Sequence, residues 1–154
     1  MTVNDSSSLD LTNAVTLEAW VYPSVNTGWR TIMMKELDAI YYLYASSATN
    51  RPGVGVNIGG YQEIFGTSTL PLNTWSHVAG TYNGATLRVY VNGVQVASKA
   101  QSGTLLRTTS PLRIGANTQW GEYFGGRIDE VRIYNRALTQ AEIQADMNTP
   151  VGPP

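Results

Sequence analysis

The chain has 154 residues, with 14% charged residues and 15 glycines, which is typical of a single turn-rich β-domain. Its formal net charge of −1 argues against nucleic acid or an anionic membrane as a partner, and no apolar run approaches the ~20 residues of a membrane span. The absence of cysteine excludes disulfides, thiolate metal sites and a cysteine nucleophile.

Short segments rich in β-branched and aromatic residues recur along the chain with turn signals between them, as in a β-sandwich or barrel. The first segment alternates clearly and places Leu17, Ala19 and Val21 on one face. The segment 40–45 (IYYLYA) is apolar on both faces, which predicts a central strand. The predicted strands are 15–22, 29–35, 40–45, 54–58, 76–82, 87–91, 94–98, 112–116 and 127–134.

Two Asn-Gly pairs, at 83–84 and 92–93, separate three consecutive predicted strands. Asn-Gly is the strongest short hairpin signal, because both residues tolerate a positive φ angle. We therefore predict a three-stranded meander over residues 76–98.

The last predicted strand is irregular. Ile128, Val131 and Ile133 cannot share one face at a strict period of two, so we predict a β-bulge near Asp129 and Glu130.

A short helix is predicted after this strand. Thr139 and Glu142 have the spacing of a capping box, which opens a helix that continues to about residue 147. The Pro-rich tail that follows, 149–154 (TPVGPP), is not expected to pack and is predicted to begin a linker to another domain.

Four segments together resemble a known family. They are 17–23 (LEAWVYP), 75–84 (WSHVAGTYNG), 87–93 (LRVYVNG) and 124–138 (FGGRIDEVRIYNRAL). In this order they resemble the LamG-like jelly-roll domains of the concanavalin A-like lectin/glucanase superfamily. The resemblance implies an all-β fold over residues 1–148, an antiparallel jelly-roll β-sandwich with one short C-terminal helix.

The beginning of the chain departs from the family pattern. Such domains usually open with a strand and turn resembling L-x-F-D-G-x-x-D-Y-V, and this chain starts roughly where that segment ends. We expect the missing strand to belong beside residues 127–134, which leaves an open sheet edge there. Residues 2–4 are expected to cover that edge, or the chain is expected to self-associate through it.

Calcium is implied only by the resemblance. The family site joins the two chain ends, where Asp5, Asp10 and Asp129 supply the hard oxygen ligands that calcium prefers. The opening turn of the family often helps to hold this ion, so its absence here leaves the binding of a structural calcium ion open.

The sequence gives little support for a catalytic site. Asp129 and Glu130 are adjacent strand residues that point to opposite faces, and the E-x-D-x-x-E strand of the superfamily's glucanases is absent. We expect one of them to accept a backbone N–H or pair with an arginine. The single histidine, His77, is expected to be packed and hydrogen-bonded to the backbone. The sequence therefore predicts a protein that is not an enzyme.

The aromatic residues divide into two groups. Trp20 and Trp75 lie within strand motifs and are expected in the core. The others lie in loop-like settings beside amide or acidic side chains, where rings can stack on the apolar face of a sugar. The candidate ligand-binding residues are Trp29, Tyr61, Gln62, Asn117, Gln119, Trp120, Glu122 and Tyr123. In the alternative interpretation, the rings merely cap the ends of the sandwich.

The favoured function is a non-catalytic carbohydrate-binding or adhesion module of a larger secreted or cell-surface protein, with a glycan or polysaccharide as partner. The alternative is a protein-binding or structural spacer module. A glycoside hydrolase is a third hypothesis, against which the missing acid motif argues.

Overall fold

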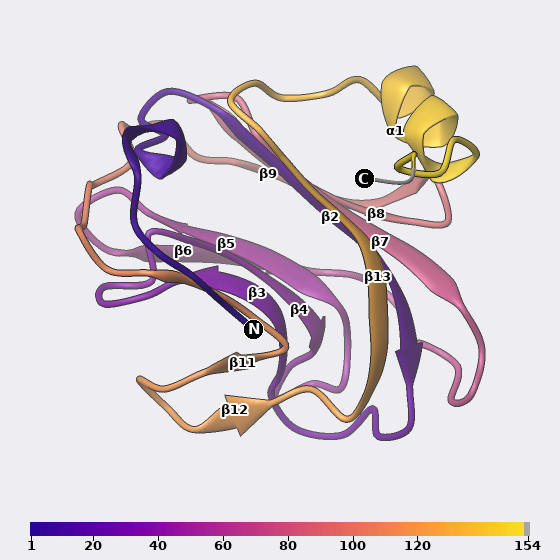
Figure 1. The fold of residues 1–154 in the computed structure, drawn as a ribbon. Helices are drawn as coiled ribbons and strands as arrows, with labels where there is room; N and C mark the ends of the chain where they lie inside the picture. The colour runs from indigo at the N-terminus through magenta and orange to yellow at the C-terminus, as the bar shows by residue number, and fades with distance from the viewer. Residues whose placement is uncertain (153–154) are drawn as a thin grey trace.

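Two antiparallel β-sheets pack face to face in the computed structural model, which describes residues 1–152 (Figure 1). The chain also forms a 3-10 helix, η1 (Ser7–Leu9), and one α-helix, α1 (Gln140–Met147). The strands are β1 (Thr2–Val3), β2 (Val15–Pro23), β3 (Arg30–Lys35), β4 (Tyr41–Ser46), β5 (Gly53–Asn57), β6 (Tyr61–Phe65), β7 (Ser76–Tyr82), β8 (Thr86–Val91), β9 (Val94–Ala100), β10 (Leu112–Ile114), β11 (Ala116–Asn117), β12 (Glu122–Tyr123) and β13 (Gly126–Tyr134).

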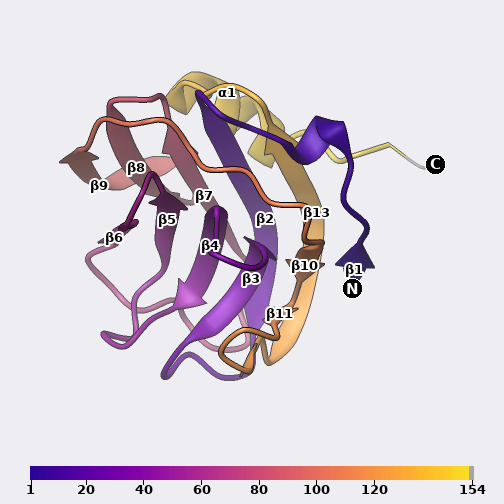
Figure 2. The same ribbon diagram turned by 90° about the vertical axis from the view of Figure 1, so that its left-hand side faces the viewer.

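One sheet has six strands in the order β1-β10-β3-β4-β5-β6, and the other has five in the order β13-β2-β7-β8-β9. Figure 2 shows the first sheet in front of the second, with α1 behind. The hairpin β11–β12 forms a small separate sheet. This architecture confirms the predicted antiparallel sandwich with one short C-terminal helix, and the neighbouring strands β7, β8 and β9 confirm the meander.

The hydrophobic core lies between the sheets. In β2 the side chains of Leu17, Ala19 and Val21 are fully buried in it, as the alternation predicts. Strand β4 is buried on both faces because one row of its side chains packs in the core and the other packs in a separate aromatic cluster. Leu43 points into the core between the sheets, whereas Tyr44 belongs to a second cluster on the outer face of the six-stranded sheet.

Helix α1 covers part of the outer face of the five-stranded sheet (Figure 1). Its buried Ile143 packs in one cluster with Ala79 of β7 and Tyr90 of β8. The predicted capping box is present at its N-terminus. At its other end, Arg132 of β13 donates to the carbonyl oxygens of Asp146 (2.8 Å) and Thr149, and so ties the end of the helix and the residues after it to the sheet.

The N-terminal residues do not cover the edge that the sequence predicted. Thr2 and Val3 pair with β10 of the six-stranded sheet, because Thr2 Oγ1 accepts from Arg113 and the Met1 amino group donates to Ile114 O. Among residues 1–152, β13 therefore remains an edge strand of the other sheet.

The predicted bulge is present in β13. The register with β2 shifts between Asp129 and Arg132, and Glu130 has a φ of 52°. Asp129 Oδ1 accepts from the Glu130 N–H at 2.9 Å, and Glu130 pairs with Arg132 at 3.2 Å. These contacts confirm the structural role expected for the adjacent acids.

Two strand-motif side chains were assigned wrongly. Trp75 is 40% exposed and not in the core, because its ring lies on the outer surface against Tyr22. Trp20 is half-buried on the same outer face, where its Nε1 donates to Met147 O. Both residues lie outside the row of β2 and β7 side chains that fills the core.

His77 is buried as predicted, but its ring is not bonded to the backbone. Neither ring nitrogen has a hydrogen-bond partner within residues 1–152. The ring lies edge-on to Trp20, and Nε2 is 3.9 Å from Glu18 Oε2. The expected backbone bond is absent, and the side chain packs instead between Trp20 and Glu18 on the outer face of the five-stranded sheet.

The beginning of the Pro-rich tail, residues 149–152, is exposed and unpacked as expected, although two hydrogen bonds join it to β13. Glu130 accepts from the Val151 N–H, and Arg132 reaches the Thr149 carbonyl oxygen. Residues 153–154 of the predicted linker lie outside the described residues. No helix in the described part of the chain is long and apolar enough to cross a lipid bilayer.

Candidate ligand-binding site

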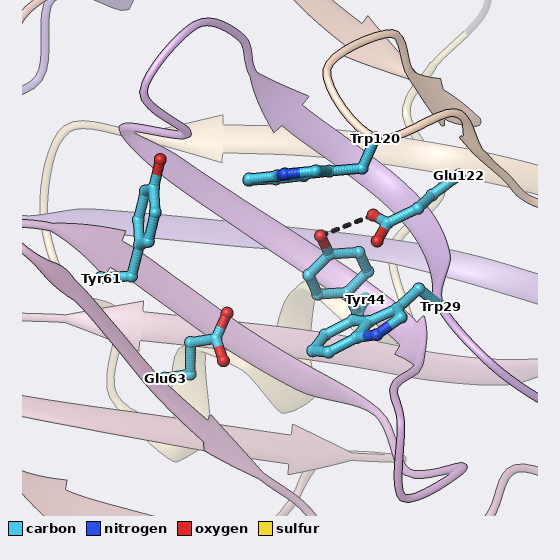
Figure 3. A pocket seen from close by; sticks show the side chains of 6 residues that line it. All are labelled: Trp29, Tyr44, Tyr61, Glu63, Trp120 and Glu122. Atoms are coloured by element: carbon cyan, nitrogen blue, oxygen red, sulfur yellow. Dashed lines mark hydrogen bonds between the residues drawn. The ribbon is translucent and has the colours of Figure 1, made fainter.

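A hollow of about 230 Å³ opens on the outer face of the six-stranded sheet. Figure 3 shows the aromatic rings around it, with one carboxylate reaching in from β6 and the other from β12. We call this hollow the aromatic pocket; its lining residues are Trp29, Tyr44, Tyr61, Glu63, Trp120 and Glu122.

Two glycines of β5 make room for rings beside the pocket. A Cβ on Gly55 would lie 2.1 Å from the Tyr42 ring, and one on Gly53 would lie 2.3 Å from Phe65. The Gly53-Val54-Gly55 segment thus lets both rings lie over the sheet. From this position the Tyr42 hydroxyl donates to Glu63 Oε1 at 2.7 Å.

The rings support one another through tilted and edge-on contacts. Trp29 lies 4.9 Å from Tyr44 and 5.9 Å from Phe65, measured between ring centroids. On the other side of the pocket, Tyr61 meets Trp120 edge-on at 6.0 Å. Such offset geometries are favourable for aromatic pairs, so the ring positions are mutually stabilised.

Glu122 is fixed by three donors on one carboxylate oxygen. Its Oε2 accepts from Asn117 Nδ2 (2.5 Å), from the Tyr44 hydroxyl (2.8 Å) and from Thr31 Oγ1 (3.3 Å). Asn117 is fully buried, and its Oδ1 accepts from the Trp120 N–H at 2.8 Å. One asparagine therefore orients both the acid and the neighbouring tryptophan.

The two tyrosines remain hydrogen-bond donors. Burial, followed by the neighbouring carboxylate of Glu63, raises the pKa of Tyr42 far above its ordinary range. Burial and the hydrogen bond to Glu122 act in the same direction on the pKa of Tyr44. Each hydroxyl therefore keeps its proton and donates it, and each glutamate accepts.

Four of the sequence-predicted residues line the pocket, namely Trp29, Tyr61, Trp120 and Glu122. A fifth, Asn117, lies beneath it. Gln119 is at its margin, where Nε2 reaches the Tyr61 hydroxyl at 3.5 Å.

The remaining two predicted residues lie outside the pocket lining. Gln62 follows Tyr61 in β6, so its side chain points to the opposite face, where it accepts from Lys99 at 3.1 Å. Tyr123 is 62% exposed, and its carbonyl oxygen accepts from Arg30.

Sequence reasoning missed two lining residues. Tyr44 was hidden in a segment that is apolar on both faces. Glu63 was missed because 61–65 was not predicted as a strand, although it is β6. The alternation of Tyr61, Glu63 and Phe65 was the signal that could have placed Glu63 beside the rings.

The three aspartates proposed for calcium do not form one site. Asp5 pairs with Lys35, Asp10 borders a separate polar hollow, and Asp129 lies in the bulge of β13. Among residues 1–152 no group of three or more His, Asp or Glu side chains is arranged to hold a metal ion. This geometry does not fit a calcium ion shared by the three aspartates.

A two-sheet antiparallel sandwich of this kind is an architecture found in lectin domains. Residues 1–144 match the Laminin_G_3 family, described as the concanavalin A-like lectin/glucanases superfamily, and the chain belongs to it. The match confirms the resemblance seen in the sequence motifs.

Solved structures with this fold include sugar-binding proteins. Domain 4 of AbnA, a GH43 extracellular arabinanase from Geobacillus stearothermophilus, solved with arabinotriose, superposes with a TM-score of 0.78 at 22% identity, over 95% of this chain and 71% of that one. A putative carbohydrate binding protein from Bacteroides ovatus gives a TM-score of 0.77 at 23% identity, over 93% and 43%. These TM-scores show a common fold.

The curated relatives are much longer proteins. Mouse Pappalysin-1 is 34% identical over 80 residues, which are 49% of this chain and 5% of that protein. The zebrafish Adhesion G-protein coupled receptor V1 is 24% identical over 147 residues, which are 88% of this chain and 2% of the receptor. The chain thus spans only a small part of each relative.

Proposed function

We propose that this chain is a carbohydrate-binding module and that the aromatic pocket receives one sugar unit. The observation that carries the proposal is the combination of four rings and two carboxylates around a single hollow. Apolar C–H faces of a pyranose stack on such rings, and its hydroxyl groups donate to the carboxylate oxygens. A hollow of about 230 Å³ is smaller than the ~300–1,000 Å³ of a site for a drug-sized ligand, which suits one monosaccharide of a longer glycan.

The relatives support the wider setting of this proposal. Arabinotriose is bound in the structure of the AbnA domain, and the botulinum neurotoxin DC binding domain, solved with SialylT, shares the fold at 14% identity. By name, the AbnA arabinanase is extracellular and the zebrafish relative is an adhesion receptor. We therefore infer that the chain is a non-catalytic module of a larger secreted or cell-surface protein.

The glycoside hydrolase, the third hypothesis from the sequence, is retained because Glu63 and Glu122 face the same hollow. A binding role accounts better for Glu122, whose Oε2 is already engaged by three protein donors. Incubation of a bound oligosaccharide with the protein, followed by mass spectrometry, should return the oligosaccharide intact. Cleavage that is lost in Glu63→Gln would establish the enzyme instead.

Self-association through the open edge of β13 is also retained as a proposal. The edge presents unpaired backbone groups, which template pairing with a second strand. The charged side chains of the bulge oppose it. Sedimentation velocity should show a concentration-dependent dimer, and a monomer at every concentration would exclude this mode.

The binding function is tested with a matched pair of tryptophans. Trp120 lines the pocket and is 46% exposed, whereas Trp75 lies on the outer surface of the other sheet and is 40% exposed. After a glycan array identifies a ligand, Trp120→Ala should weaken its affinity at least tenfold, about 1.4 kcal/mol. Trp75→Ala should leave the affinity unchanged, and both variants should keep the melting temperature within a few degrees.

Three outcomes would count against the proposal. An array with no bound glycan would favour the protein-binding or spacer module. Unchanged affinity in Trp120→Ala would remove the pocket from the binding surface. A loss confined to Trp75→Ala would place the sugar on the opposite face.

A further inference from the structure

We propose that the aromatic pocket recognises a protonated amine, so that its preferred glycans carry free amino sugars and not neutral or N-acetylated ones. This inference rests on the proposed function and specifies its ligand class. It is carried by the charge of the pocket, by the hydrogen-bonding capacity of the two acids and by the arrangement of the rings.

The pocket has two acidic groups and no basic one among its lining residues. The basic side chains on neighbouring segments are engaged elsewhere. Arg30 donates to the carbonyl oxygens of Thr27 and Tyr123, and Lys99 donates to Gln62. These bonds to neutral oxygens leave both basic side chains charged, but neither side chain forms an ion pair with Glu63 or Glu122 within residues 1–152. Two carboxylates that no cation contacts generate a local negative potential, which attracts a cation and disfavours a carboxylated or sulfated sugar.

Each acid has one carboxylate oxygen to offer a ligand. Glu63 Oε1 accepts from Tyr42, and Glu122 Oε2 accepts from its three partners. No hydrogen bond from residues 1–152 reaches Glu63 Oε2 or Glu122 Oε1. These oxygens only accept, so they suit a ligand rich in donors, and an ammonium group carries three donors and no acceptor.

The rings provide the second attraction to a cation. The face of an aromatic ring, tryptophan above all, attracts an ammonium group that lies within about 6 Å of its centroid. Trp29, Tyr44, Tyr61 and Trp120 enclose the same space into which the acids point (Figure 3). An N-acetyl group removes the charge and adds bulk, so it would lose both interactions.

Three β-1,4-linked hexasaccharides isolate this effect because they share a backbone and differ at carbon 2. The glucosamine oligomer has an amine there, the N-acetylglucosamine oligomer an amide, and the glucose oligomer a hydroxyl. Calorimetry at pH 5.5, where the amine is protonated, should give an affinity for the glucosamine oligomer at least tenfold above the other two. Raising the salt concentration should reduce this preference, since screening weakens exposed charge interactions.

Two isosteric substitutions test whether the preference for the glucosamine oligomer arises in the aromatic pocket. Glu63→Gln removes one charge but keeps an oxygen that accepts from Tyr42, and should lower affinity for the glucosamine oligomer at least fivefold. It should change binding of the neutral oligomers by less than twofold. Glu142→Gln is the control for non-specific attraction of a polycation, because Glu142 is on α1 and Gln preserves the capping box.

The outcomes separate this inference from the proposed function. Equal affinity for the three oligomers, with loss in Trp120→Ala, would overturn the inference and leave the carbohydrate-binding function standing. An equal effect of Glu63→Gln and Glu142→Gln would also overturn it. If no oligomer binds but choline or a trimethyl-lysine peptide does, both the amino-sugar assignment and the carbohydrate function fail.

Discussion

The two outer faces of the sandwich each hold a glutamate, and the two glutamates differ in how the protein hydrogen-bonds their carboxylates. On the open face, Glu122 borders the aromatic pocket and accepts three hydrogen bonds from Thr31, Tyr44 and Asn117. On the face covered by α1, the Glu18 side chain is fully buried and neither oxygen accepts a hydrogen bond from residues 1–152. Its nearest cation is Arg132, 3.5 Å away.

On the covered face, two buried titratable side chains, Glu18 and His77, are both held neutral under mildly acidic conditions. Burial, reinforced by Asp146, raises the pKa of Glu18 to about 7, and Arg132 opposes this shift only in part. Burial lowers the pKa of His77 to about 4. Each carboxylate on the open face thus has one oxygen held by the protein and one that residues 1–152 leave to a ligand, whereas Glu18 belongs to the packing under the helix.

The largest expected effect concerns pH on the covered face. The pKa of Glu18 rises on folding from 4.5 to about 7, so its contribution to the free energy of unfolding is full below pH 4.5 and lost by about pH 7. The pKa of His77 falls from 6.5 to about 4, so its contribution is full above pH 6.5 and lost by about pH 4. In the native chain, between about pH 4.5 and 6.5, Glu18 makes the free energy of unfolding fall with pH while His77 makes it rise, so the two effects oppose each other.

Substituting either Glu18 or His77 should reveal the pH dependence that the remaining residue gives to the free energy of unfolding. In His77→Asn the free energy of unfolding should fall by the order of 3 kcal/mol from pH 4.5 to 7. In Glu18→Gln it should rise by a similar order between pH 4 and 6.5. Urea titrations across this range measure both, with the double variant as control. Parallel profiles for all four proteins would contradict this account.

The second prediction concerns a glycine of β5 on the open face, where an added Cβ should disturb the aromatic pocket. Gly55→Ala places a Cβ against the Tyr42 ring, so it should cost about 1–3 kcal/mol of stability and displace the donor to Glu63. Ligand affinity should fall with it. Gly60→Ala is the matched control, because a Cβ there meets no atom within 4 Å. Thermal melting and calorimetry should separate the two variants, and equal behaviour would show that the glycine does not shape the site.

The sequence predicted the fold where local signals and tertiary structure agree. The Asn-Gly turns, the bulge at Asp129 and the capping box at Thr139 are encoded within a few residues, and all three were confirmed. The expectation that residues 2–4 cover the edge of β13 was wrong, because strand pairing across more than 100 residues leaves no local signal.

The site was predicted only in part for a similar reason. Trp29 and Trp120 were found because each ring lies beside a glycine turn. Tyr44 looked like core, since a central strand is apolar on both faces and the sequence does not say which row faces the other sheet. Asn117 was identified, but as a ligand contact and not as the buried group that orients Glu122.

The smallest expected effect tests whether the two faces are independent. Thr139 Oγ1 accepts from the Glu142 N–H, and the Glu142 carboxylate accepts from the Thr139 N–H. Thr139→Ala removes this cap and should cost about 1 kcal/mol, because an eight-residue helix depends on its caps and on its packing at Ile143. Amide exchange should accelerate in α1, while ligand affinity stays unchanged since the pocket lies on the other sheet. Glu142→Gln, which keeps the box, should show little acceleration. A loss of affinity in Thr139→Ala would mean that the covered face supports the open one through the core between the sheets.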